Sequence, residues 1–243
     1  MATTSEVPAP PRPARPKASC RPPTRPVLRV AALGGVAGPV AFLVACILAS
    51  MSAPRYSSSN DAISELAAVG ADSRGLMTGG FIALALCALP YAMALRSALG
   101  GRAWITATQT GLALLLVAAI PLGRSTATDH FHGIAALVGY ATLAVTPLLA
   151  IRPLVVRGYR GVACLGIATA TMSATALILS DTTSLTGLFQ RIGLTAGLLW
   201  VAGSSVAMAC GRLPSRSIAA TVRSVAVAGR MPRGARPVGG EPT

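Results

Sequence analysis

YSSSNDAISELAAVGADSRGLMTGGF, residues 56–81, is the longest polar interval between two apolar stretches of this chain. It contains three of the seven acidic residues, Asp61, Glu65 and Asp72. If residues 59–70 are helical, Asp61 and Glu65 share one face of the helix. The opposite face then carries the apolar residues Ile63, Leu66 and Ala67. This pattern is typical of a short amphipathic segment that lies along a membrane surface or covers the end of a helix bundle.

The overall composition is that of an integral membrane protein. Of the 243 residues, 53% are apolar and 12% are charged, and the mean hydropathy is positive. A helix that crosses a bilayer needs about 20 mostly apolar residues. Six such stretches are present: 29–52, 75–95, 103–122, 133–151, 161–180 and 192–210. The sequence therefore predicts an all-α fold, a polytopic transmembrane six-helix bundle over residues 29–210, with the amphipathic segment in its first outer loop.

The positions of the arginines predict the orientation. A formal net charge of +14 would suit a nucleic-acid-binding protein, but the basic residues gather in the two tails and in two loops. This is the distribution that the positive-inside rule describes. The outer loops keep four basic residues: Arg55, Arg74, Arg124 and Arg191. We expect a bacterial cytoplasmic (inner) membrane protein with both termini in the cytoplasm, membrane lipids as its partners and no nucleic acid.

The two tails are expected to lie outside the bundle. Residues 1–28 are basic and rich in proline and have no apolar face, which predicts a disordered cytoplasmic tail. Residues 211–243 form a second basic cytoplasmic tail. Within it, 214–228 forms either an amphipathic helix on the inner leaflet or part of a free tail.

Residues that could act as acids, bases or ligands gather on the predicted outer side. Three interpretations are open. The first is that loops are simply polar. In the second, a small ligand or lipid headgroup binds to an outward-facing polar cluster at the rims of the spans. The residues of that cluster are Asp61, Ser64, Glu65, Arg124, His132 and Arg191. The third is a structural pairing of Asp61 or Glu65 with Arg124 or Arg191 that needs no ligand.

Two further interpretations use the histidines of the loop 123–132. Asp129, His130 and His132 could hold a metal ion, but histidines two residues apart point to different sides of a helix, so we predict no metal. His132 with Asp129 or Glu65 could serve a membrane-embedded hydrolase or transferase acting on a lipid at the outer leaflet.

We favour a non-enzymatic role over catalysis: binding or sensing a lipid or small ligand, or supporting an envelope partner. The sequence contains no nucleotide-binding loop, nucleophile elbow or paired-cysteine metal motif, so no cofactor is predicted. The oligomeric state is left open.

Several short motifs resemble the bacterial domain-of-unknown-function 998 family. The first outer segment carries Ile63-Ser64-Glu65-Leu66, then Gly70, and Leu76-Met77 and Phe81 open the second helix; His132-Gly133 and Ala135-Ala136 open the fourth. Members often carry a Pro-Asp pair after the third span, whereas Leu122 follows Pro121 here. The resemblance covers roughly residues 30–210. It implies six helices and a membrane location, and no established activity.

Overall fold

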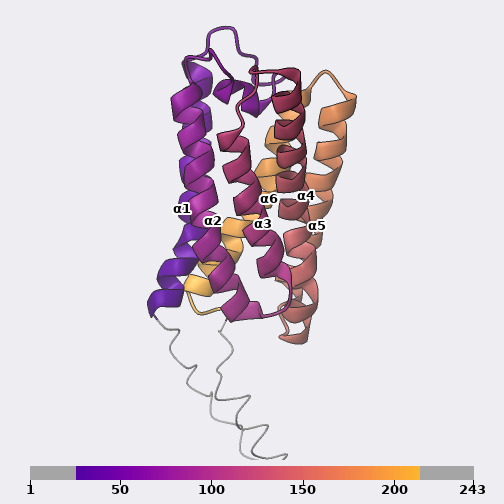
Figure 1. Cartoon of the computed structure of the whole chain (residues 1–243). Helices are drawn as coiled ribbons and strands as arrows, with labels where there is room; N and C mark the ends of the chain where they lie inside the picture. Colours follow the sequence, from indigo (N-terminus) through magenta and orange to yellow (C-terminus); the bar gives the residue numbers. More distant parts are fainter. Residues whose placement is uncertain (1–25, 214–243) are drawn as a thin grey trace, which may run out of the picture.

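The fold is a bundle of six long helices and one short helix (Figure 1). A computed structural model describes residues 26–213. In chain order, the helices are α1 (Pro26–Met51), the 3-10 helix η1 (Ile63–Ala67), α2 (Arg74–Leu99), α3 (Ala103–Ala119), α4 (Thr126–Val156), α5 (Arg160–Thr182) and α6 (Thr186–Ala209). No strand occurs between residues 26 and 213. The predicted all-α six-helix bundle is confirmed.

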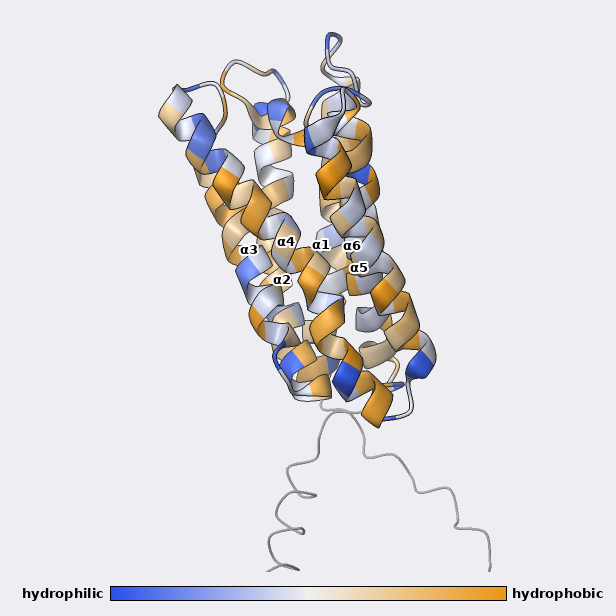
Figure 2. Cartoon of the chain, turned by 90° about the vertical axis from the view of Figure 1, so that its right-hand side faces the viewer, coloured by the Kyte–Doolittle hydropathy of each residue, from blue (hydrophilic) through white to orange (hydrophobic). Residues whose placement is uncertain are grey.

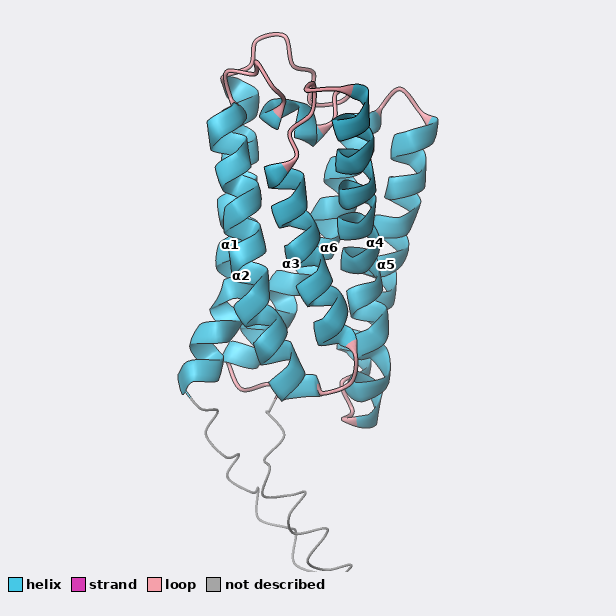
Figure 3. Ribbon diagram, viewed as in Figure 1, coloured by secondary structure: helices cyan, strands magenta, loops and turns pink. Residues whose placement is uncertain are grey.

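The helices form a closed ring in which consecutive helices pack against each other and α6 returns to α1 (Figure 3). The η1 end of the bundle contains η1 and the loops that join α1 to α2, α3 to α4, and α5 to α6. The opposite end, which we name the arginine end, contains the other two loops and both ends of the described chain (Figure 1). An even number of helices places Pro26 and Leu213 at this same end.

The helices are mostly hydrophobic along their length, and hydrophilic residues gather toward the two ends of the bundle (Figure 2). Five of the helices are long and apolar enough to cross a membrane. The shorter α3 has 17 residues; at 1.5 Å per residue it is about 25 Å long, near the lower limit for a span. Large exposed side chains on the helix sides, such as Val44, Ile47 and Leu199, suit contact with lipid. The protein is a multi-pass membrane protein.

Glycines allow the helices to approach closely. A Cβ atom on Gly34 would lie 2.6 Å from the carbonyl oxygen of Cys87, and one on Gly38 would lie 2.7 Å from the Cβ of the same residue. On α6, a Cβ atom on Gly197 would lie 2.7 Å from Cγ of Leu143 on α4. Contact between backbones is a common basis of helix association in membranes, and these glycines supply it here.

Helix α4 begins at Thr126, well before the predicted start at residue 133. The Ser125 hydroxyl accepts a hydrogen bond of 3.2 Å from the Thr128 N–H, and the Thr128 hydroxyl accepts one of 2.9 Å from the Ser125 N–H. This reciprocal cap starts the helix inside the segment 123–132 that was predicted to be a loop. Likewise, α6 begins at Thr186, before the predicted start at residue 192.

The first outer segment is helical over a shorter range than expected. Of the predicted helix 59–70, only Ile63–Ala67 forms. The Asp61 carboxylate accepts a hydrogen bond of 2.6 Å from the Ser57 N–H, which holds Asp61 in the preceding turn. Asp61 and Glu65 therefore do not share a helix face. The expected apolar face is correct, because Ile63, Leu66 and Ala67 are all buried.

Most of the predicted tails lies outside the described residues. The exceptions are residues 26–28, which belong to α1 rather than to the predicted tail 1–28, and residues 211–213, which follow α6. The predicted amphipathic helix 214–228 is outside the described range.

Candidate ligand-binding site

A narrow cavity runs through the centre of the ring. The cavity has a volume of about 80 Å³, counted as the space that the centres of water molecules could occupy. Its wall comes from α1, α2, α3, α4 and α6, and η1 covers one end, while α5 packs outside α4 and α6 and contributes nothing to it. On α6, the lining residues recur every three or four positions: Gln190, Leu194, Leu198 and Val201. This spacing keeps them on one face of the helix.

His132 is the most deeply buried titratable side chain of the predicted cluster, with 3% of its surface exposed. Its Nδ1 lies 2.5 Å from the carbonyl oxygen of Ile120. A carbonyl oxygen only accepts, so Nδ1 must carry the proton. The other ring nitrogen, Nε2, is buried and has no hydrogen-bond partner within residues 26–213. In the neutral ring, Nε2 is an unused acceptor at the edge of the cavity.

Three neutral polar residues, Ser64, Tyr140 and Gln190, line the η1 half of the cavity together with His132, and the other polar lining residues are Tyr91, Thr110 and Thr146. Gln190 uses its side-chain oxygen to accept a hydrogen bond of 3.0 Å from the Ile63 N–H, which ties η1 to α6. Its amide N–H groups remain available as donors. Neither the Ser64 hydroxyl nor the Tyr140 hydroxyl has a hydrogen-bond partner in the described part of the chain. The η1 half of the cavity therefore combines an apolar wall with one acceptor, one amide donor and the hydroxyls of Ser64 and Tyr140.

Arg191 fixes the outer loop to the start of α6. One guanidinium nitrogen donates to the carbonyl oxygens of Ser58 at 2.6 Å and Gly187 at 3.0 Å, and the other donates to the Tyr56 hydroxyl at 2.6 Å. The guanidinium also lies 5.5 Å from the centre of the Tyr56 ring. The Arg191 guanidinium is therefore bound by neutral oxygens and an aromatic ring rather than by a carboxylate.

The Tyr56 hydroxyl stands between Arg191 and the backbone of the loop. It lies 3.2 Å from the carbonyl oxygens of both Asp61 and Ala62, to which it donates. Burial raises the pKa of Tyr56 above its ordinary value, an effect that the nearby Arg191 charge partly opposes. The neutral hydroxyl is therefore retained as a donor.

Glycine at position 187 is required by this contact between loop and helix. A Cβ atom there would collide with the carbonyl oxygen of Asp61 and would lie 2.7 Å from that of Ser58.

The carboxylates of the predicted cluster bind backbone N–H groups. Glu65 accepts a bond of 3.3 Å from Ala62, and Asp129 accepts one of 2.8 Å from Gly123. The expected pairing of Asp61 or Glu65 with Arg191 is replaced by the contacts of Arg191 with carbonyls. The expected partnership of His132 with Asp129 or Glu65 is replaced by the bond from His132 to Ile120.

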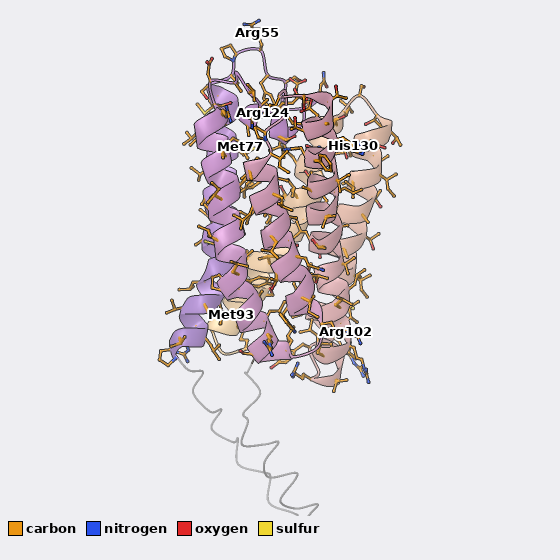
Figure 4. The ribbon with its side chains drawn as sticks, in the orientation of Figure 1. Arg55, Met77, Met93, Arg102, Arg124 and His130 are labelled. Carbon is orange, nitrogen blue, oxygen red and sulfur yellow. The ribbon has the colours of Figure 1, made fainter. Side chains whose placement is uncertain are left out.

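Arg124 and His130 are exposed and lie at the η1 end with Arg55, whereas Arg102 lies at the arginine end (Figure 4).

The family model described as "Protein of unknown function (DUF998)" matches residues 36–207. The chain belongs to the DUF998 family. The match covers η1, the whole of α2 to α5 and most of α1 and α6, so all lining residues of the cavity except Gly34 and Gly35 belong to the family region of the chain. No curated protein and no solved structure matches the chain significantly.

Within residues 26–213 of this DUF998 protein, no three His, Cys, Asp or Glu side chains converge on a position that could hold a metal ion. His130 is exposed and His132 is buried, although both lie on α4. Two residues along a helix correspond to about 200° of rotation, which separates the two rings.

The residues that sequence reasoning missed in this DUF998 protein are Tyr56, Tyr140 and Gln190. The signal for two of them was the spacing along a single helix. Tyr140 follows His132 by eight residues, with Ala136 between them, and Gln190 precedes Leu194 and Leu198 at the same interval of four. Tyr56 left no such signal, because its role depends on how the loop folds against α6.

Proposed function

We propose that this DUF998 protein is a non-enzymatic binding protein that holds a small, mainly apolar molecule in its central cavity, with the polar group of that molecule beside His132 and Tyr140. The observation that supports this most directly is the buried Nε2 of His132, which has no partner in residues 26–213. A buried polar atom without a hydrogen bond costs free energy, on the order of 1–3 kcal/mol. A bound ligand that donates to Nε2 would remove that cost.

The size and lining of the cavity support a small ligand. One water-sized group needs about 10–15 Å³ of such space, so 80 Å³ accommodates about five to eight. The wall is mostly Leu, Phe, Val, Ala and Gly, which is a poor environment for a cluster of waters. Apolar clefts with few polar groups are the usual form of small-molecule sites.

The arrangement around His132 favours binding over the hydrolase or transferase alternative. In a catalytic His–carboxylate pair, the carboxylate stabilises the imidazolium that forms when the histidine takes a proton, whereas Nδ1 of His132 donates to a neutral backbone carbonyl. The carboxylates of Glu65 and Asp129 are occupied by backbone N–H groups.

Charge supports a location in the cytoplasmic membrane with the η1 end outside. In the described chain, all five acidic residues lie at the η1 end: Asp61, Glu65, Asp72, Asp129 and Asp181. The arginine end carries seven arginines and no acidic residue among residues 26–213. The positive-inside rule then assigns the arginine end to the cytoplasm. Labelling of a cysteine at exposed Ser59 by a membrane-impermeant thiol reagent in intact cells tests this, and labelling only after lysis would contradict it.

Native mass spectrometry of protein released from mild detergent tests the binding function. Ala136 lies between His132 and Tyr140 on the cavity side of α4, so Ala136→Phe should fill the space beside both. Leu137 points outward, and Leu137→Phe is the matched control. We expect a co-purifying mass on the wild type and on Leu137→Phe that is absent from Ala136→Phe. Bare protein in all three samples, or equal occupancy in all three, would contradict the proposal.

A further inference from the structure

We infer that the ligand of the central cavity is a neutral alcohol, whose hydroxyl donates to Nε2 of His132 and accepts from Gln190 or Tyr140. The inference rests on the proposed binding function and specifies the chemical class of the ligand.

The charge of the cavity lining restricts the ligand. None of the residues that line the cavity is Asp, Glu, Lys or Arg. The electrostatic influence of Arg191 reaches Tyr140, but the Arg191 guanidinium is held by the carbonyls of Ser58 and Gly187 and by Tyr56. A carboxylate, phosphate or ammonium group inside the cavity would be a buried charge without a partner, which is strongly unfavourable. The polar group of the ligand is therefore neutral.

The hydrogen-bonding groups of His132 and Gln190 restrict the ligand further. Nε2 of neutral His132 only accepts, so the ligand must supply a donor. The Gln190 amide N–H groups only donate, so the ligand must also accept. A ketone, ether or ester offers acceptors alone and would leave Nε2 without a partner. A hydroxyl supplies one donor and two acceptor lone pairs, which is the set that these residues require.

The polar side chains of α4 lie close together along the cavity. His132, Ala136 and Tyr140 recur at intervals of four along the cavity face of α4. A helical side chain leans toward the N-terminus of its helix, so the Tyr140 ring extends toward His132. Ala136, between them, has only a methyl group. The polar atoms thus surround one part of the cavity, while Leu194, Leu198 and Leu143 offer an apolar path for the rest of the molecule.

Ligand-observed fluorine NMR on the full-length protein in phosphatidylcholine nanodiscs tests this inference. The probes are trifluorobutanol, trifluorobutyrate and trifluorobutane, which share one carbon skeleton and carry their fluorines on its terminal carbon. Ala136→Phe and Leu137→Phe separate binding in the cavity from partition into lipid. We expect trifluorobutanol to bind the wild type and Leu137→Phe, but not Ala136→Phe. Trifluorobutane should bind about 25-fold more weakly, because two hydrogen bonds are lost.

A second variant keeps the test decisive without altering the histidine. Tyr140→Phe removes a hydroxyl that has no partner within residues 26–213, so it should fold. We expect it to lower the affinity for trifluorobutanol by about fivefold, the contribution of one neutral hydrogen bond, and to leave that for trifluorobutane unchanged.

Each other result overturns a defined part of the argument. Equal affinities for the alcohol and the alkane would refute the alcohol assignment and leave an apolar binding site in place. Tighter binding of trifluorobutyrate would refute it in favour of an anion. No difference between the wild type and Ala136→Phe with any probe would refute both the assignment and the binding function.

Discussion

Tyr91 and Tyr140 both line the central cavity, but within residues 26–213 only the Tyr91 hydroxyl has a hydrogen-bond partner. Tyr91, in the arginine half, shares a buried hydrogen bond of 2.9 Å with Ser204 of α6. Nearby, Thr110 pairs with Thr142 at 2.9 Å and Thr146 donates to Thr106 at 2.8 Å, which joins α3 to α4. In the η1 half, the Tyr140 hydroxyl and Nε2 of His132 have no partner in residues 26–213.

This difference separates a structural half from a binding half. Polar groups in a membrane protein stabilise the bundle when they bond across helices, and they cost stability when they are buried alone. Two other unpartnered atoms, Nε1 of Trp200 and Oγ of Ser205, do not line the cavity, so a ligand there would not reach them. His132 and Tyr140 of the η1 half line the cavity and also carry polar atoms without a partner in residues 26–213, which is why we assign the binding function to this half.

The largest effect is expected where the loop is fixed over the binding half. Arg191→Gln removes charged hydrogen bonds to Ser58, Gly187 and Tyr56 and should lower the free energy of unfolding by about 2–3 kcal/mol. Unfolding in mixed detergent micelles measures it. Glu65→Gln should lower the free energy of unfolding much less, because within residues 26–213 its exposed carboxylate accepts a hydrogen bond only from the Ala62 N–H. The two losses in the free energy of unfolding should add, since the two side chains do not pair. A double variant that is no less stable than either single variant would show that the side chains interact.

The next largest effect on stability is expected at Gly187, where the outer loop contacts the start of α6. Gly187→Ala should lower the free energy of unfolding by about 1–3 kcal/mol, because its Cβ meets the carbonyls of Asp61 and Ser58. Gly203→Ala, on the same helix, is the control: its Cβ meets nothing within 4 Å and should leave stability unchanged or raise it by up to about 1 kcal/mol. Equal destabilisation by both variants would mean that the loop does not rest on α6.

The comparison of the two tyrosines can be tested by matched variants. Tyr91→Phe should lower the free energy of unfolding by about 0.5–1.5 kcal/mol, because it removes the bond to Ser204. Tyr140→Phe, measured without added ligand, should leave stability unchanged or slightly higher, because it deletes a hydroxyl without a partner. If Tyr140→Phe were the more damaging of the two, the assignment of the halves would be reversed.

The smallest effect is expected at alkaline pH. Burial raises the folded-state pKa of Tyr56 above the unfolded value of about 10. The stability linked to Tyr56 is complete below about pH 10 and is lost as the pH rises through the higher folded-state pKa, because the unfolded chain releases its proton first. Unfolding midpoints between about pH 9 and pH 11 should therefore fall less steeply in Tyr56→Phe than in the wild type. Identical slopes would contradict this linkage.

Much of the fold could be read from the order of apolar and charged residues. Six apolar stretches predicted six helices, and the sorting of arginines and acids between alternate loops matches the two ends of the bundle. The start of α4 was missed because Ser125 and Thr128 form a cap that polarity alone does not reveal. The helix at 59–70 was overestimated because Asp61 and Tyr56 bind the backbone of a turn instead.

The sequence by itself determined that residues 26–213 form six apolar helices, five of them long enough to cross a membrane, with acids and histidines at one end, because hydropathy and charge act on each segment independently of its neighbours. Only the tertiary structure decided which polar atoms are paired. Arg191 meets carbonyls rather than carboxylates, and His132 faces a cavity enclosed by five helices, because these contacts depend on how distant segments pack.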